Sequence, residues 1–484
     1  MKNPLLRLAI PALLLAATAC TPREKTLVLL STNDIHAQIQ NFPQLAAAVE
    51  ACRDTTDRVV LIDAGDRWTG NPFVDRTESP GMPVIRLMNR LGYDVATLGN
   101  HEFDHGQAFL GRIIDSMDYP VICANLRSDT CTFPQLPPSL VLERGGIRIG
   151  LVGVVTNYEG PGHPAGHAAS FAGLTFPDPQ EAALEQAAAL RDRVDVLVLV
   201  SHMGDDRDEE LLQRGTPYDV VIGGHTHVVR NSVIEGTRLT QSEKNLKYVG
   251  VTRVKLRGRK VVDTSYELVE LAAYDAAQPY ADEVLHYYAD PELNRAAGSF
   301  RNGGDKLLIG QWIARSLAAS MKADVGFYHR GGVRLDTIPA GPVSRATIYA
   351  LEPFNSTAVV QSMTPEQLRR IIIAKYNDTH NLKEAHRIDL IASTPYVLLT
   401  DADDQAIDVR FPQLQEGRRY RMAYNDYVFK NYAEVDRAAG GLLEEVRINE
   451  LLLDELGAGK PLSFDDRLLQ TVEVRSPSDL PAAL

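Results

Sequence analysis

The first half of the chain alternates short apolar runs with longer stretches of helical periodicity. The apolar runs are rich in β-branched residues and end in turn-forming residues, as buried strands do. Between them lie helical stretches such as residues 178–193. The pattern predicts an α/β domain. The five strands predicted from it cover residues 26–31, 59–63, 94–98, 194–201 and 218–224.

Each of these predicted strands runs directly into side chains that can bind a metal. Asp, Asn or His follows every one of the five, and five of the 12 histidines of the chain fall there. A single such aspartate is usually a turn former or a helix cap, and a single histidine is usually an ordinary surface residue. Because open α/β sheets place ligands beyond the carboxyl ends of their strands, the joint occurrence favours a metal site over coincidence.

The ligand types point to divalent ions of intermediate hardness. Imidazole suits zinc, iron, nickel and manganese, whereas aspartate and asparagine oxygens suit harder ions. Two ions about 3.5–4 Å apart need a ligand that bridges them, and a carboxylate with two oxygens does this. An all-thiolate set, which would select soft metals, is absent from the sequence.

Residues 101–105, with the sequence HEFDH, also match H-E-x-x-H, the helical zinc signature of many metalloproteases. That interpretation needs both histidines on one face of a helix. Gly99 and Asn100 favour a tight turn before His101, and Gly106 shortens any helix after it. We therefore predict that His101 lies in a turn, and we reject the protease interpretation.

Five motifs in order resemble the calcineurin-like metallophosphoesterases, and the fuller strings GNHEFDHG and GGHTH are similar to the secreted 5′-nucleotidase branch of that family. The resemblance runs from about Leu27 to about Leu271 and fills every metal-binding motif. It implies an N-terminal β-sandwich flanked by helices. The motifs are D-x-H at residues 34–36, G-D at 65–66, G-N-H-E-F-D at 99–104, H-x-G at 202–204 and G-H-T-H at 224–227.

The resemblance further implies two divalent metal ions, zinc, manganese or similar, that share the carboxylate of Asp66. Each ion has four expected ligands. They are Asp34, His36, Asp66 and His227 for the first ion, and Asp66, Asn100, His202 and His225 for the second.

By the same resemblance, His101 turns toward the substrate and stabilises the transition state. Asp104, three residues later, can reach its imidazole if one helical turn follows. Glu102 and His105 are expected to be bystanders.

The second half of the chain resembles the 5′-nucleotidase C-terminal domain, a second α/β domain, less closely. Residues 275–298 are polar and helical in pattern and are interpreted as a connector. The predicted organisation is a signal peptide at 1–19, a lipidated tether at 20–26, the metallophosphoesterase domain at 27–271, the helical connector at 272–298 and the substrate-binding domain at 299–484.

Three residues of the second half are candidates for contacts with a substrate. Two aromatic rings can sandwich a base for about 1–3 kcal/mol per stacked face, and Phe354 and Tyr427 are the candidates, with core packing as the alternative. Arg334 follows two glycines and could hold a phosphate with its planar guanidinium. His329 and Arg330 replace the Asn and first Gly of the usual family turn, and the usual G-G-D after Tyr427 is missing.

The N-terminus has the pattern of an export signal. Lys2 and Arg7 precede an apolar stretch that is too short to span a membrane, and residues 17–20, Ala-Thr-Ala-Cys, resemble a bacterial lipobox. The resemblance implies cleavage before Cys20 and its acylation, hence a lipid anchor in the bacterial cell envelope, on the periplasmic or surface face of the outer membrane. A plain signal peptide is the alternative. No later segment is long and apolar enough to cross a membrane.

Export would place the mature chain in an oxidising compartment. Three cysteines then remain, Cys52, Cys123 and Cys131, and their pairing is left open by the sequence. The formal net charge of −13 argues against a nucleic-acid polymer as partner, whereas a small anionic substrate needs only local cations.

The expected activity is hydrolysis of phosphate monoesters, foremost nucleoside 5′-monophosphates, outside the cytoplasm. Alternatives with the same site are a 2′,3′-cyclic-nucleotide 2′-phosphodiesterase with 3′-nucleotidase activity, a UDP-sugar or dinucleotide pyrophosphatase, and the related sulfur-oxidising hydrolase. An alternative of another class is a surface-anchored protein that binds nucleotides without turnover.

Overall fold

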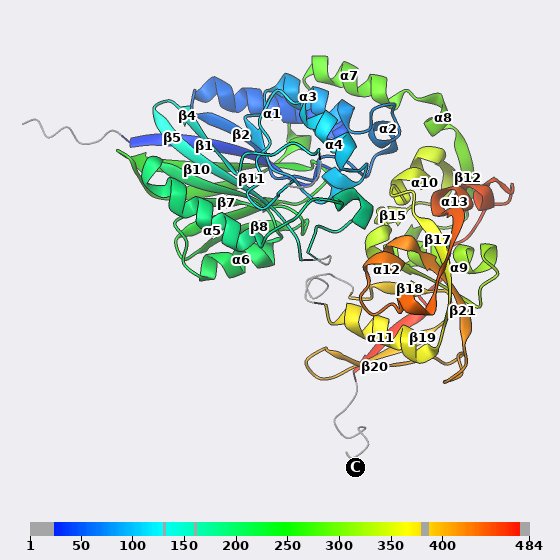
Figure 1. Ribbon diagram of the computed structural model, residues 1–484. Coiled ribbons are helices and arrows are strands. Elements are labelled where there is room, and N and C mark those ends of the chain that lie inside the picture. Colours follow the sequence, from blue (N-terminus) through cyan, green and yellow to red (C-terminus); the bar gives the residue numbers. More distant parts are fainter. Residues whose placement is uncertain (1–23, 129–131, 159–161, 379–386, 475–484) are drawn as a thin grey trace, which may run out of the picture.

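The computed structural model describes residues 24–128, 132–158, 162–378 and 387–474. Within them the chain forms two α/β domains, the first coloured blue to green and the second yellow to red in Figure 1. The predicted signal peptide, Cys20 and Cys131 lie outside the described residues. Cys52 and Cys123 are free thiols.

Two mixed sheets packed face to face form the N-terminal domain. Their strand orders are β11-β10-β1-β2-β3 and β4-β5-β6-β7-β9-β8. Leu29 and Ile62 of the first sheet and Ile149 and Val198 of the second belong to one buried cluster between them. The strands are β1 Glu24–Thr32, β2 Val59–Asp63, β3 Val95–Ala96, β10 Tyr248–Arg257 and β11 Lys260–Glu270, then β4 Ser139–Arg144, β5 Ile147–Val155, β6 Val196–His202, β7 Val220–Ile222, β8 Val229–Ile234 and β9 Thr237–Ser242.

Helices cover the outer face of each sheet. The sequence explains why α5 begins where it does. Pro179 is its first residue, and the Asp178 side chain caps it by accepting the Glu181 N–H. The helices on the first sheet contribute their buried residues to one apolar cluster, and the helices on the second sheet contribute theirs to another. The helices are α1 Phe42–Thr55, α2 Pro72–Asp75, α3 Met82–Leu91 and α4 Gln107–Ile114 on the first sheet, and α5 Pro179–Leu190 and α6 Asp205–Gln213 on the second.

All five predicted strands are present, and they run in parallel sets. β1, β2 and β3 are parallel neighbours, with Thr32 opposite Asp63 and Asp63 opposite Ala96. β5, β6 and β7 form the parallel set of the other sheet. The carboxyl ends of both sets therefore open on the same edge of the sandwich, where the predicted ligands follow. The sandwich flanked by helices confirms the expected fold of this half.

The segment between the domains is helical as far as Asn294. It contains α7 Gln278–Tyr288, which lies above α1 and α3 in Figure 1, and α8 Pro291–Asn294. The predicted helical connector, residues 272–298, is wrong in its last residues, because β12 begins at Ala296 and pairs with β16.

The C-terminal domain has a five-stranded sheet of order β18-β14-β21-β17-β22 and a three-stranded sheet of order β20-β19-β23. Among the described residues no helix is both long and apolar enough to span a membrane. The elements are β12 Ala296–Phe300, β13 Gly304–Asp305, α9 Lys306–Ser320, β14 Val325–His329, β15 Thr337–Ile338, β16 Gly341–Ser344, α10 Arg345–Leu351, β17 Thr357–Met363, α11 Pro365–Tyr376, β18 Leu390–Ala392, β19 Tyr396–Thr400, β20 Ala406–Arg410, β21 Tyr420–Asn425, α12 Asp426–Asn431, β22 Leu442–Arg447, α13 Ile448–Gly457 and β23 Gln470–Val474.

Candidate metal centre and substrate cavity

The predicted ligands meet where strands of both sheets end. They lie in the loops after β1, β2, β3 and β7 and at the last residue of β6. Six of them fall into two groups whose ligand atoms lie within 4.8 Å of one another. The groups are Asp34, His36 and His227, and Asp66, His202 and His225.

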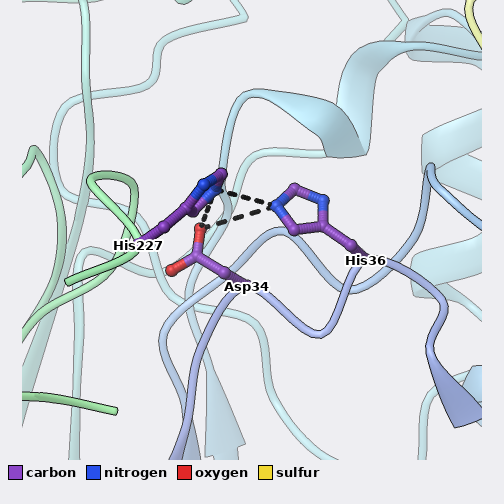
Figure 2. A group of neighbouring side chains, drawn as sticks. All are labelled: Asp34, His36 and His227. Carbon is purple, nitrogen blue, oxygen red and sulfur yellow. Dashed lines mark hydrogen bonds and ion pairs between the residues drawn. The ribbon is translucent and has the colours of Figure 1, made fainter. Parts of the chain in front are cut away.

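The first group combines residues that follow β1 of one sheet and β7 of the other, and Figure 2 shows its three side chains close together. His36 Nε2 lies 3.0 Å from His227 Nε2, and His227 Nε2 lies 3.4 Å from Asp34 Oδ1. His36 Nε2 is 3.9 Å from the same oxygen. Three donor atoms that all point at one small volume are the arrangement expected for ligands of a cation.

The second group is arranged around Asp66 and His202. His202 Nε2 is fully buried and lies 3.1 Å from Asp66 Oδ2. His202 Nδ1 lies 2.6 Å from the Ala64 carbonyl oxygen, a contact that places a proton on Nδ1 and directs Nε2 at Asp66. Asn100 Oδ1 lies 3.1 Å from His225 Nδ1.

Asp66 is shared between groups. Its carboxylate also lies within ligand distance of His36 and His101, so it stands between the two sets of imidazoles. This position suits a bridging carboxylate. The donor set of nitrogen and oxygen atoms fits divalent ions such as zinc or manganese.

The backbone at these ligands is strained. Positive φ values are uncommon for residues other than glycine, and each such position costs on the order of 1–3 kcal/mol. Such strain persists only where the surrounding structure enforces it. The ligands concerned are Asp34 (φ 49°), His36 (48°), Asp66 (56°), His225 (81°) and His227 (58°).

At Asp66, Glu102 supplies that enforcement, which corrects the expectation that it is a bystander. Its fully buried carboxylate accepts the Asp66 N–H at 2.9 Å and the Arg67 N–H at 2.8 Å, and it also accepts the Gly99 N–H. The buried Arg67 guanidinium in turn donates to Asp63 Oδ1 at 3.0 Å. Glu102 therefore ties the β2 loop to the β3 loop and is a positioning residue. The H-E-x-x-H string was the only sequence signal that singled it out.

The turn predicted at His101 is confirmed. His101–Phe103 form a single 3-10 turn, and α4 begins only after Gly106. His101 Nδ1 lies 2.7 Å from Asp104 Oδ2, and the His101 N–H donates to Asp66 Oδ1 at 2.8 Å. Burial lowers the pKa of His101, but Asp104 and Asp66 raise it above its ordinary value. His105 contacts the Phe109 ring at 5.4 Å, away from the ligand groups.

The charge states of the buried groups differ from one ligand to the next. Burial raises the pKa of Asp66, but the imidazoles of His202 and His101 hold it well below its ordinary value. Burial together with Arg334 and His227 holds the pKa of His36 well below its usual range. Burial lowers the pKa of His202, but Asp66 and Asp34 raise it to about 10, so a bound cation would displace a proton from this imidazole.

Opposite the metal ligands, the C-terminal domain closes a cavity of about 750 Å³. His36, His225 and His227 line it from one side, and Arg334 and Tyr427 from the other. Arg334 Nη2 lies 3.3 Å from His36 Nε2, so the guanidinium reaches the edge of the metal centre.

The two candidate aromatic residues lie in different surroundings. Phe354 is stacked on His101, with ring centroids 5.8 Å apart, beneath the Arg334 guanidinium at 5.7 Å. Tyr427 is stacked on His329 at 4.7 Å. Tyr427 lines the cavity, and Phe354 is not among its lining residues. His329 thus occupies one face of the Tyr427 ring, a contact that sequence reasoning missed.

Comparisons with known proteins agree with this architecture. Residues 27–229 match the calcineurin-like phosphoesterase family, and residues 289–436 match the 5′-nucleotidase C-terminal domain. The crystal structure of a 5′-nucleotidase precursor from Thermus thermophilus superposes with a TM-score of 0.81 at 21% identity, covering 94% of this chain and 100% of that one, and so has the same fold.

Among curated proteins, the chain is 26% identical over 402 residues to Endonuclease YhcR of Bacillus subtilis, a match covering 72% of this chain. It is 26% identical over 367 residues to the 5′-nucleotidase of Rattus norvegicus, covering 70% of this chain. The chain spans 32% of the length of the Bacillus protein and 58% of the rat protein.

Proposed function

Because the chain belongs to the calcineurin-like phosphoesterases and carries a 5′-nucleotidase C-terminal domain, we propose that it hydrolyses nucleoside 5′-monophosphates to nucleoside and phosphate outside the cytoplasm. Its family is one of metal-dependent phosphoester hydrolases. The observation that carries the proposal is the shared position of Asp66 between two groups of metal ligands, one of which, His36, lies 3.3 Å from the Arg334 guanidinium.

In this proposal two divalent ions are held at the strand ends. When bound, they would supply Lewis-acid stabilisation of the phosphoryl oxygens and activation of the attacking water. The four proposed ligands of one ion are Asp34, His36, Asp66 and His227. The four of the other are Asp66, Asn100, His202 and His225.

The remaining residues position the substrate and move the proton. Asp104 holds His101 Nδ1 at 2.7 Å, which leaves Nε2 to stabilise charge on the reacting phosphoryl group and to protonate the leaving ribose oxygen. Arg334 offers a planar set of donors to the phosphate. Phe354 and Tyr427 are proposed to contact the nucleoside, and Tyr427, stacked on His329, lines the cavity.

Location is part of the proposal and is supported by the N-terminal sequence. Cleavage before Cys20 and its acylation would anchor the enzyme in the cell envelope. Replacing Cys20 with serine is expected to release the protein from the membrane fraction into the soluble periplasmic fraction, whereas unchanged fractionation would contradict lipid anchoring.

A substrate panel with metal analysis tests the activity. Purified mature protein, loaded with manganese or zinc, is assayed for consumption of AMP, of a 2′,3′-cyclic nucleotide and of UDP-glucose, with the products separated by chromatography. Fastest turnover of AMP supports the proposal, and fastest turnover of one of the other two substrates replaces the proposal by the corresponding alternative. Nucleotide binding without turnover of any of the three would indicate a binding protein.

A further inference from the structure

The lining of the cavity contains more cations than carboxylates, and its acidic residues are Asp206, Asp378 and Asp389. Lys244 reaches it from the N-terminal domain, and Lys306, Arg330 and Arg334 reach it from the C-terminal domain. The pKa of Lys306 falls to about 8, first because of burial and then because the charges of Lys244, Arg334 and Arg330 are close to it. In a chain of net charge −13, such a cluster concentrates anions locally.

Other cations of the cavity have strong partners of their own. Lys430 pairs with Asp426 at 2.7 Å. Lys375 pairs with Asp378 at 3.5 Å. Arg437 donates to backbone carbonyl oxygens, among them that of Phe429 at 2.9 Å.

Lys306 differs from these three. Its ion pair, with Asp336, is long at 3.8 Å, and the Asp336 side chain is 67% exposed. Exposed pairs of this kind contribute little, so Asp336 offsets only a small part of the Lys306 charge, and Lys306 lines the cavity.

The position of Lys306 also opposes local stability. It is the first residue of α9, where Asp305 caps the helix by accepting the Leu308 N–H at 2.9 Å. A cation at a helix N-terminus is unfavourable, and three neighbouring cations add repulsion. Residues that break a local rule in this way are expected at functional sites.

The cluster lies beside the metal centre and does not coincide with it. Arg334 contacts His36 on one side and is electrostatically close to Lys306 on the other. Lys306 and Arg334 both lie close enough to His329 to lower its pKa, and His329 is stacked on the Tyr427 ring. The cluster therefore lies between the metal ligands and the proposed nucleoside contact, within a cavity that is large enough for more than a monophosphate.

We infer that Lys244, Lys306 and Arg330 form a second anion subsite, which binds a second phosphoryl group of the nucleotide substrate. That group is carried in a pyrophosphate link or as an ester on another ribose hydroxyl. The inference rests on the proposed function and gives a role to Arg330, which replaces the first glycine of the family turn.

Turnover of three nucleotides tests the subsite and distinguishes the two sources of the second phosphate. AMP, ADP and adenosine 3′,5′-bisphosphate are compared by kcat/KM in the wild type, in the double variant Lys244→Met/Lys306→Met, and in Lys247→Met. Lys247 is in the same loop, pairs with Glu243 at 2.6 Å and is not a cavity-lining residue, so its variant controls for loss of charge alone.

One of the two doubly phosphorylated nucleotides is expected to exceed AMP in kcat/KM by about tenfold in the wild type and in Lys247→Met, and to lose about that factor relative to AMP in the double variant. The preferred nucleotide identifies the position of the second phosphate. A ratio to AMP that is the same in all three proteins would overturn the subsite while hydrolysis of AMP upheld the proposed function.

Binding of inorganic pyrophosphate, measured by calorimetry in EDTA, gives a readout that needs no turnover. The double variant is expected to bind it about tenfold more weakly than the wild type and Lys247→Met. Equal affinities would overturn the subsite. If pyrophosphate binding follows the expectation but no nucleotide is hydrolysed, the proposed function fails and the anion subsite stands.

Discussion

The metal centre lies on loops that follow parallel strands of two packed sheets, whereas the substrate wall of the cavity lies on shorter elements of the C-terminal domain. Five of the predicted ligands have positive φ, and the buried carboxylate of Glu102 ties the loop after β2 to the loop after β3. On the side of the C-terminal domain, Tyr427 is stacked on His329, and Phe354 is stacked on His101. A strained centre of metal ligands thus faces a wall of stacked rings and cations, and changes at the two should differ in size and kind.

The largest effect is expected at the bridging carboxylate. Asp66→Asn removes one negative charge from between the two ligand groups and should lower kcat by about a thousandfold or more, since catalysis depends on both ions. Asp208→Asn is the matched control, because this buried carboxyl lies outside both ligand groups and burial raises its pKa to about 7. Equal losses in the two variants would indicate general damage to the fold.

The next effect is expected at the catalytic histidine. His101→Asn should lower kcat by about 10²- to 10⁴-fold while the bound metal stays at the wild-type level, because the imidazole acts on the substrate. Metal content and steady-state turnover are measured on the same preparation. Loss of metal together with activity would make His101 a ligand, which its position near His36 and Asp66 makes a real alternative.

A change at Glu102, which supports the ligand loops, should appear first in the free energy of unfolding. Glu102→Gln weakens a buried carboxylate that faces Arg67 and three backbone N–H groups, and should lower the free energy of unfolding by about 3 kcal/mol. Urea denaturation monitored by circular dichroism measures it. Wild-type stability in this variant would contradict the positioning role of Glu102.

The smallest effect on activity is expected at Arg334, on the side of the cavity opposite the metal ligands. Arg334→Lys keeps the charge but loses the planar set of donors, and should raise KM for AMP by about tenfold with a minor change in kcat. Arg315→Lys, on the exposed side of α9 and paired with Asp465, serves as the control. If Arg334→Lys lowered kcat as strongly as Asp66→Asn, the contrast between the two walls would be lost.

The contrast between the regions also explains what could be predicted from the sequence. Ligands at strand ends are local: a buried apolar run followed by Asp or His predicts both the strand and the place of the side chain, so the convergence of Asp34, Asp66 and His202 could be expected. The turn at His101 followed from Gly99 and Gly106.

Other features depend on contacts between distant segments and leave no local pattern. The role of Glu102 arises because its carboxylate meets the loop after β2, 35 and 36 residues away in sequence. The stacking of His329 on Tyr427 joins β14 to α12. The early end of the helical connector follows from pairing of β12 with β16, which helical periodicity in residues 275–298 does not reveal.

Metal content per chain, measured by mass spectrometry on wild type and Asp66→Asn after loading with manganese or zinc and removal of free ion, tests the central claim most directly. A centre of two ions bridged by Asp66 predicts about two equivalents in the wild type and about one or fewer in the variant. One equivalent in both proteins, or two in both, would contradict a bridging role for Asp66.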